Sequence, residues 1–297
     1  MAIARPLAQG REGSGSAART SNLDVVLTTI AYVVLTAAAL AMFVPFIFSL
    51  ATSLKTNAEA NRLTFSNMFW PHDATLHAFR VAKDASIGRW FLNSALVAAI
   101  WVIGRAFTAS LAGYAFARMR FPGRNLLFLM VLSTLMIPGI VTIIPKFILL
   151  QKLHLLNSYG ALTIPFLSEA FGIFLMKQFF ESIPPELEEA ARVDGASRYR
   201  MFAQIILPNA MPALTALAIF SFQGSWNAFL EPVIFISGSN PNLFTLPLGL
   251  ANFRQTFYTD WPVLMAISVI TTVPMAIFFI IFQRWFVEGQ TTSGIKG

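Results

Sequence analysis

The side chains most able to take a chemical role in this sequence are charged groups inside long apolar segments. Arg105 lies near the middle of one apolar segment, and Glu169 lies within another. A charge that is removed from water is costly unless it is compensated, so these two residues are expected to pair with each other or to face an aqueous cavity. For Arg105 the alternative is that its long side chain extends to the nearest aqueous surface.

A second group of polar side chains, Gln223, Asn227 and Glu231, recurs at intervals of four residues. Residues four apart lie on the same face of a helix. Within an apolar segment such groups face the protein interior or a water-filled path, where they can hydrogen-bond a polar solute. They are therefore candidate solute contacts, with hydrogen bonds between helices as the alternative.

No pattern in the sequence predicts a catalytic or metal site. The histidines, His72, His77 and His154, lack the spacing of metal ligands and are expected to be ordinary surface residues. Cysteine is absent, and so are the His-Glu-x-x-His and Gly-x-Ser-x-Gly motifs. The Gly-x4-Gly-Lys-Ser/Thr motif of nucleotide-binding loops is also missing, so this chain is not expected to hydrolyse ATP itself.

Membrane-spanning helices must position these polar residues. The sequence is 56% hydrophobic and only 12% charged, whereas soluble domains carry about 25% charged residues. A helix needs about 20 mostly apolar residues to cross a bilayer. Pro138, Pro145 and Pro274 predict kinks within the third and sixth of the expected spans. The segments that meet the required length are roughly 25–50, 91–117, 125–150, 158–180, 209–236 and 262–284.

Small residues recur every four positions in the second span, at Ala109, Gly113 and Ala117. This spacing lets two helices approach closely. We expect the stripe to pack against another helix of the same chain, with a seam between subunits as the alternative.

The polar segments between the spans predict the orientation of the chain in the membrane and its division into domains. The basic run at 118–124 lies in the shortest loop, where the Lys/Arg bias is most reliable, and it predicts that both termini are cytoplasmic. The net charge of +7 is spread over membrane-flanking loops, so membrane lipid is an expected partner and nucleic acid is not. The expected domains are a disordered tail at 1–23, the first span and an external loop at 24–87, a core of five spans at 88–284, and a tail at 285–297.

Residues 181–208 form an insert between the fourth and fifth spans that is too polar to cross a membrane. Ser182 can cap a helix that contains two prolines in its first turn. Gly195 can supply a left-handed stop, and Ser197 can cap a second short helix that ends before Pro208. The predicted structure is a helix–turn–helix at the membrane surface, whose apolar side packs on a protein or on lipid headgroups.

The insert contains the pattern E-A-A-x3-G-x9-I-x-L-P, met at every fixed position by Glu189, Ala190, Ala191, Gly195, Ile205, Leu207 and Pro208. In this pattern it is similar to the EAA loop of binding-protein-dependent ABC importer permeases. Further segments at 114–124, 136–145, 245–253 and 283–297 resemble the carbohydrate-uptake branch, in particular the smaller maltose-type permease subunit. The resemblance covers nearly everything from about residue 25 onward.

The resemblance implies an all-α, type I ABC importer permease bundle in the plasma membrane of a bacterium or archaeon. A homologous second permease would complete the path for a sugar, and an extracellular solute-binding protein would deliver that sugar. ATP and Mg would bind to a dimer of partner ATPase subunits, and this chain would hold no cofactor. The EAA residues, together with Asp194, would dock on the ATPase, with Glu189 contacting a basic group and Gly195 fixing the angle between the short helices.

The resemblance also implies roles for the C-terminal tail, an external loop and three arginines. The tail at 289–297 would insert between the ATPase subunits, and the loop at 237–260 would reach towards the binding protein. Three arginines would flank the docking seat or hold lipid phosphates, namely Arg192, Arg198 and Arg200.

Two features depart from the family pattern. Family members commonly place an acid after the Trp-Asn pair, where this sequence has Ala228, with Glu231 one turn on. They have small or apolar residues at the positions of Arg105 and Glu169.

Two other classes of function are alternatives. An ion-coupled secondary transporter usually shows internal repeats and ion ligands near the membrane midplane. The sequence has no convincing halves of three spans each, and that class leaves the EAA loop unexplained. An intramembrane enzyme would require a nucleophile or metal constellation, which the sequence lacks.

Overall fold

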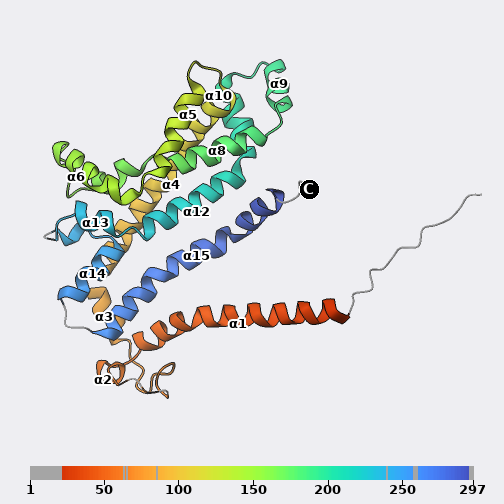
Figure 1. Ribbon diagram of the computed structural model, residues 1–297. Coiled ribbons are helices and arrows are strands. Elements are labelled where there is room, and N and C mark those ends of the chain that lie inside the picture. Colours follow the sequence, from red (N-terminus) through yellow and green to blue (C-terminus); the bar gives the residue numbers. More distant parts are fainter. Residues whose placement is uncertain are drawn as a thin grey trace, which may run out of the picture. The chain divides into compact units, whose positions relative to one another are not determined.

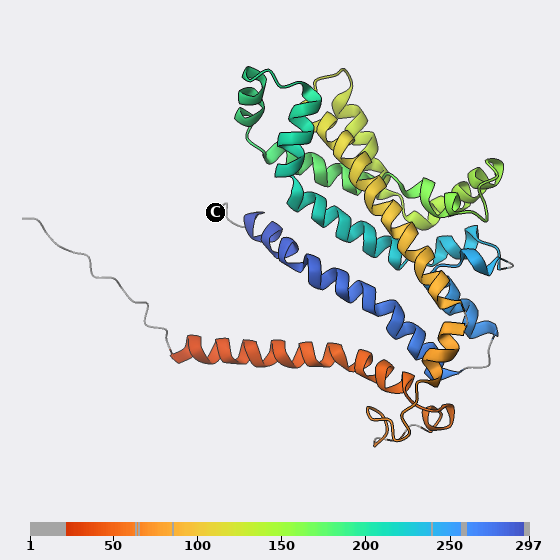
Figure 2. The same cartoon turned by 180° about the vertical axis from the view of Figure 1, so that it is seen from behind.

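The computed structural model describes residues 22–62, 64, 66–84, 86–238, 240–256 and 260–293. These residues form helices and turns without a strand, in agreement with the predicted all-α class (Figures 1 and 2). The chain divides into two compact units, Met1–Phe48 and Ser49–Gly297. The α-helices are α1 Asn22–Ser53, α2 Asn57–Ala60, α3 His77–Asp84, α4 Ile87–Arg118, α5 Arg124–Ser133, α6 Ile143–Lys152, α7 Tyr159–Thr163, α8 Ala170–Ser182, α9 Glu186–Val193, α10 Arg198–Met201, α11 Leu207–Asn209, α12 Met211–Trp226, α13 Leu230–Phe235, α14 Leu246–Thr256 and α15 Trp261–Ser293. Shorter 3₁₀ turns are η1 Thr134–Met136, η2 Gly139–Thr142, η3 Ile164–Phe166 and η5 Pro241–Leu243, and η4 Phe202–Ile206 is a π-helix.

The described residues contain three continuous helices that are long and apolar enough to cross a membrane. They are Val25–Ser53, Ile87–Arg118 and Trp261–Phe282. Three further candidate spans consist of two helical pieces that meet at an angle. If each bent pair is one span, the total is the predicted six. The bent pairs are Arg124–Met136 with Gly139–Lys152, Tyr159–Phe166 with Ala170–Ser182, and Arg198–Asn209 with Met211–Trp226.

The third span is broken rather than kinked, because its two pieces meet at 99°. Ile137, which precedes Pro138, has extended backbone angles (φ −88°, ψ 116°). A proline ring disfavours the helical conformation in the residue before it, so the helix stops there. Pro145 lies in the first turn of α6, where an amide donor is not needed. Pro274 lies within α15, which continues through it.

The fifth span differs from the prediction of a helix over 209–236. Helix α12 ends at Trp226, and α13 is a separate short helix that begins at Leu230. The piece that joins α12 at its start bends away from it by 74°. Pro232 would remove a hydrogen bond from the interior of a continuous helix, but it fits the first turn of α13.

Helix α4 packs along α8 and α12, and α15 lies beside α12 (Figure 2). Glycines allow the closest approaches. A Cβ atom on Gly113 of α4 would lie 2.8 Å from the Cβ of Met176 on α8, and one on Gly172 of α8 would lie 2.9 Å from Leu217 on α12. Ala109 and Gly113 therefore serve packing within one chain, as expected.

Candidate coupling loop and intramembrane polar sites

The polar insert folds as two short helical segments joined by a tight turn. Helix α9 begins after Pro185 rather than at Ser182, which is the last residue of α8 and donates its hydroxyl to the Phe179 carbonyl. The expectation that Ser182 caps the first helix is therefore wrong. Gly195 has a φ of +77°, the left-handed conformation that glycine adopts freely.

The second segment begins where it was predicted and ends later. The Ser197 hydroxyl accepts a hydrogen bond from the amide of Arg200, as a capping residue does. The segment then continues from α10 through η4 into α11 and ends at Asn209. Pro208 does not stop it, because proline is tolerated in the first turn of α11.

One side of α9 is open to solvent and the other is buried. Glu189, Ala190 and Asp194 are exposed, and Val193 is 89% exposed. Ala191 is buried against the bundle. Of the other EAA residues, Gly195 and Pro208 are exposed, and Ile205 and Leu207 are half-buried.

Arg118, the last residue of α4, fixes the buried side of α9. Its guanidinium forms an ion pair with the carboxylate of Glu188, at 3.2 Å between Nε and Oε1. Its Nη2 donates to the carbonyl of Phe180 at 2.7 Å and also to the carbonyl of Ile183. One side chain thus joins α4, the end of α8 and α9, an arrangement that we call the Arg118 clamp.

Sequence reasoning missed the Arg118 clamp. It used the basic run at 118–124 only for orientation and gave Glu188 no partner. The available signal was that Glu188 precedes the buried Ala191 by three residues and so shares its face of α9.

The intramembrane charges form a direct pair, as one of the two expectations held. Nη1 of Arg105 lies 2.6 Å from Oε2 of Glu169, and Nε donates to the carbonyl of Phe166 at 2.9 Å. The guanidinium also lies 4.4 Å from the ring centroid of Trp101. Arg105 is 7% exposed, so its side chain does not extend to an aqueous surface.

Glu169 sits at the break inside the fourth span. Its backbone is extended (φ −144°, ψ 148°), and it immediately precedes α8. A carboxylate at this position is stabilised by the partial positive charge at the start of a helix. Its side chain remains 29% exposed, which leaves part of the carboxylate open.

The three candidate solute contacts do not share one helix. Gln223 and Asn227 are exposed on consecutive turns of α12, with Asn227 at its C-cap. Glu231 lies on α13, beside a small enclosed space that Trp101 and Thr245 also line. No hydrogen bond from the Gln223 or Asn227 side chain to another helix occurs in the described part of the chain, which does not favour the alternative of interhelical hydrogen bonds.

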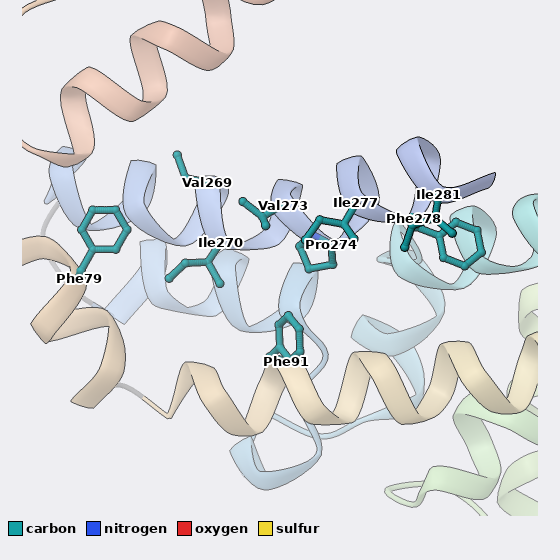
Figure 3. Close-up of a pocket in the computed structure, with 9 residues that line it drawn as sticks. All are labelled: Phe79, Phe91, Val269, Ile270, Val273, Pro274, Ile277, Phe278 and Ile281. Atoms are coloured by element: carbon teal, nitrogen blue, oxygen red, sulfur yellow. The ribbon is translucent and has the colours of Figure 1, made fainter. Parts of the chain in front are cut away.

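A groove of about 520 Å³ lies between α3, α4 and α15 (Figure 3). Phe79 and Phe91 line one side, and Val273, Pro274 and Phe278 are among the residues on α15 that line the other. Every side chain that lines it is apolar, so it offers no polar group to a hydroxylated solute.

Comparison with known proteins agrees with this architecture. The family described as binding-protein-dependent transport system inner membrane component matches residues 107–291. The arabinooligosaccharides transport system permease protein AraQ of Halalkalibacterium halodurans is 37% identical, over 85% of this chain and 91% of its own length. The sulfoquinovosyl glycerol transport system permease protein SmoH of Agrobacterium fabrum is 36% identical, over 85% and 88% respectively.

The fold is also that of a solved transporter subunit. A chain from the crystal structure of a bacterial ABC transporter involved in the import of the acidic polysaccharide alginate superposes with a TM-score of 0.80. The superposition covers 90% of this chain and 98% of the other, at 23% identity. This protein therefore belongs to the family of binding-protein-dependent transport system inner membrane components, and it is a multi-pass permease subunit of the inner membrane.

Proposed function

We propose that this chain is one of two permease subunits of an ATP-driven sugar importer, in which separate subunits bind ATP and Mg²⁺. The observation that carries the proposal is the geometry of the EAA loop. Helix α9 exposes several residues of the motif and is held from behind by the Arg118 clamp. The relative from Halalkalibacterium halodurans is named for the transport of arabinooligosaccharides, which supports a sugar as the solute.

The exposed side of α9 is the proposed seat for an ATP-binding subunit. Glu189 supplies a negative charge beside the apolar surface of Ala190 and Val193, and a basic group on the partner complements it. Asp194 and Gly195 form the turn that sets the direction of the second segment. Ala191 supports that seat from its buried side, and the second segment contributes the remaining residues of the motif, namely Ile205, Leu207 and Pro208.

The solute path and the orientation follow from this seat. Gln223, Asn227 and Glu231 are the proposed polar contacts along the path, which a second permease completes. Because α9 faces the ATP-binding subunits, it lies on the cytoplasmic side. It follows the fourth of six spans, so both termini lie on that side as well. An extracellular solute-binding protein delivers the sugar at the opposite surface.

Copurification tests the docking seat. Glu189→Lys reverses a charge on the exposed side of α9, and Glu186→Lys is the matched control, since both are exposed carboxylates in the first turn. With an affinity tag on this chain, we expect the Glu189 variant to lose most of the ATP-binding subunit that copurifies from native membranes. Equal recovery from the two variants would exclude Glu189 as a docking contact.

Energy coupling tests the class of transporter. In intact cells, uptake should stop when ATP hydrolysis is blocked by vanadate and persist when an uncoupler removes the ion gradient at constant ATP. The opposite result would identify an ion-coupled secondary transporter.

A further inference from the structure

The start of α8 and the last two turns of α12 lie side by side. The ring of Phe171 on α8 meets the ring of Phe220 on α12, with centroids 5.6 Å apart in an edge-on arrangement. One turn further along α12, a Cβ atom on Gly224 would lie 4.0 Å from Nη1 of Arg105, the same nitrogen that binds Glu169. Arg105 therefore lies between Glu169 and the Gly224 turn of α12, next to the aromatic contact.

These contacts define which face of α12 looks towards Glu169. Phe220, Gln223, Gly224 and Asn227 are spaced at i, i+3, i+4 and i+7, so they occupy one continuous arc of the helix. Phe220, Gln223 and Asn227 are exposed. The opposite arc of the helix is buried, and it includes Ser221, Ser225 and Trp226.

Together with Glu169 and Phe171 at the start of α8, this face combines three polar groups with two aromatic rings. We call Glu169, Phe171, Phe220, Gln223 and Asn227 the polar–aromatic strip. A carboxylate accepts hydrogen bonds from hydroxyl groups, and a side-chain amide both donates and accepts them. An aromatic ring offers a flat apolar surface to the C–H groups of a sugar ring. This is the composition of a site that contacts a hydroxylated solute.

The ion pair presents its negative end, and not its positive end, to the strip. Arg105 is 7% exposed, whereas the side chain of Glu169 is 29% exposed. The positive charge is therefore withdrawn beneath Trp101, and the negative charge stands at the open end of the pair. Fields of this kind are stronger where low-dielectric walls surround them.

We propose that the polar–aromatic strip is the surface with which this subunit contacts the solute, and that it favours uncharged hydroxylated solutes over anionic ones. Glu169 accepts hydrogen bonds from solute hydroxyls, and Arg105 is a positioning residue that holds the carboxylate at the strip. The proposal rests on the proposed function, since it requires a solute path through the subunit.

Thiol labelling of the assembled transporter tests the proposal, because the natural sequence has no cysteine. Gln223→Cys introduces one thiol on the strip. We expect it to react with 2-(trimethylammonium)ethyl methanethiosulfonate faster than with the anionic 2-sulfonatoethyl methanethiosulfonate, relative to a free thiol. In the Glu169→Gln background this cation preference should fall by about threefold to tenfold, because the negative charge of the strip is lost.

Companion variants keep the test decisive. Ile103→Cys is the control, since Ile103 is an exposed apolar residue two positions from Arg105, and it should remain unreactive. If Glu169→Gln prevents assembly, Arg105→Leu with Glu169→Leu removes both charges and should abolish the preference in the same way. If Gln223→Cys impairs assembly, Asn227→Cys replaces it.

Two results would overturn the inference while leaving the transporter class intact. The first is an unreactive thiol at position 223 in complexes that still drive ATP-dependent uptake, which would mean that a partner helix or lipid covers the strip. The second is a reactive thiol whose charge preference does not depend on Glu169. Loss of ATP dependence itself would instead contradict the proposed function.

Discussion

Replacing Arg118 with glutamine removes the side chain that joins α4, α8 and α9. The variant loses the ion pair with Glu188 and a charge-assisted hydrogen bond of 2.7 Å to the Phe180 carbonyl, together with the bond to Ile183. It also leaves the carboxylate of Glu188 without its partner. The loss falls on the buried side of α9, so the exposed residues of the proposed docking seat keep their chemistry.

The cost can be bounded from these contacts. Hydrogen bonds that involve a charged group contribute about 1.5–3 kcal/mol each. Removing one partner of a buried ion pair costs about 3–5 kcal/mol. The side chains of Arg118 and Glu188 remain 14% and 12% exposed, which allows some solvent relief and favours the lower end. A loss of about 3 kcal/mol raises the population in which α9 is detached by roughly a hundredfold.

Hydrogen exchange measures this population directly. In the purified transporter, the amides of α9 should exchange roughly a hundredfold faster in Arg118→Gln, and less solute should be moved per ATP hydrolysed. Arg118→Lys should be intermediate, because one ammonium group cannot reproduce the fork of the guanidinium. Arg120→Gln is the control, since Arg120 is exposed in the same basic turn. If exchange in Arg118→Gln stays within twofold of the natural protein, the clamp does not hold α9.

Three further predictions concern single contacts. Arg105→Leu should destabilise the detergent-solubilised protein by about 3–5 kcal/mol, and adding Glu169→Leu should recover most of that loss; equal melting temperatures for the single and double variants would contradict the pairing argument. Gly113→Ala should lower stability by about 1–3 kcal/mol because α8 leaves no room for a methyl group, whereas Gly88→Ala, on the same helix with open space around it, should not; similar thermal melts would refute the close packing. Burial lowers the pKa of Lys55, so the charged form is disfavoured in the folded protein. Thermal stability should therefore rise with pH between that lowered pKa and the usual value of 10.5. A Lys55→Met variant should lack this rise in thermal melts taken from pH 8 to 10.5.

Two signals that act over a few residues were read correctly from the sequence. Gly195 adopts a positive φ, and Ser197 caps the following helix, because each depends only on its neighbours in the chain. Ser182 was misjudged although the relevant signal is also local. Ile183 precedes a proline and is extended (φ −72°, ψ 129°), so α8 must end before it and α9 can begin only after the two prolines.

Contacts between distant segments were accessible only where a chemical need narrowed the options. A pair between Arg105 and Glu169 was one of the expected arrangements because a lone charge in a bilayer is costly. Arg118 and Glu188 belong to segments that the sequence places outside the spans, where water could satisfy each charge, so nothing in the sequence required their meeting. Their contact follows from the packing of α4 on α8, which brings residues far apart in the chain together.

The two arginines of α4 bind opposite ends of α8, one beside the proposed coupling loop and the other beside the proposed solute strip. Arg105 and Arg118 are separated by about 20 Å along α4 at 1.5 Å per residue. We therefore expect α8 to move together with α4, so that a displacement of α9 reaches Glu169. The test is a disulfide between Ala109→Cys and Gly172→Cys, since a Cβ on Gly172 would lie 3.3 Å from that of Ala109. Transport should survive the crosslink, with the reduced double variant as control. Loss of uptake on oxidation alone would show that α4 and α8 move separately.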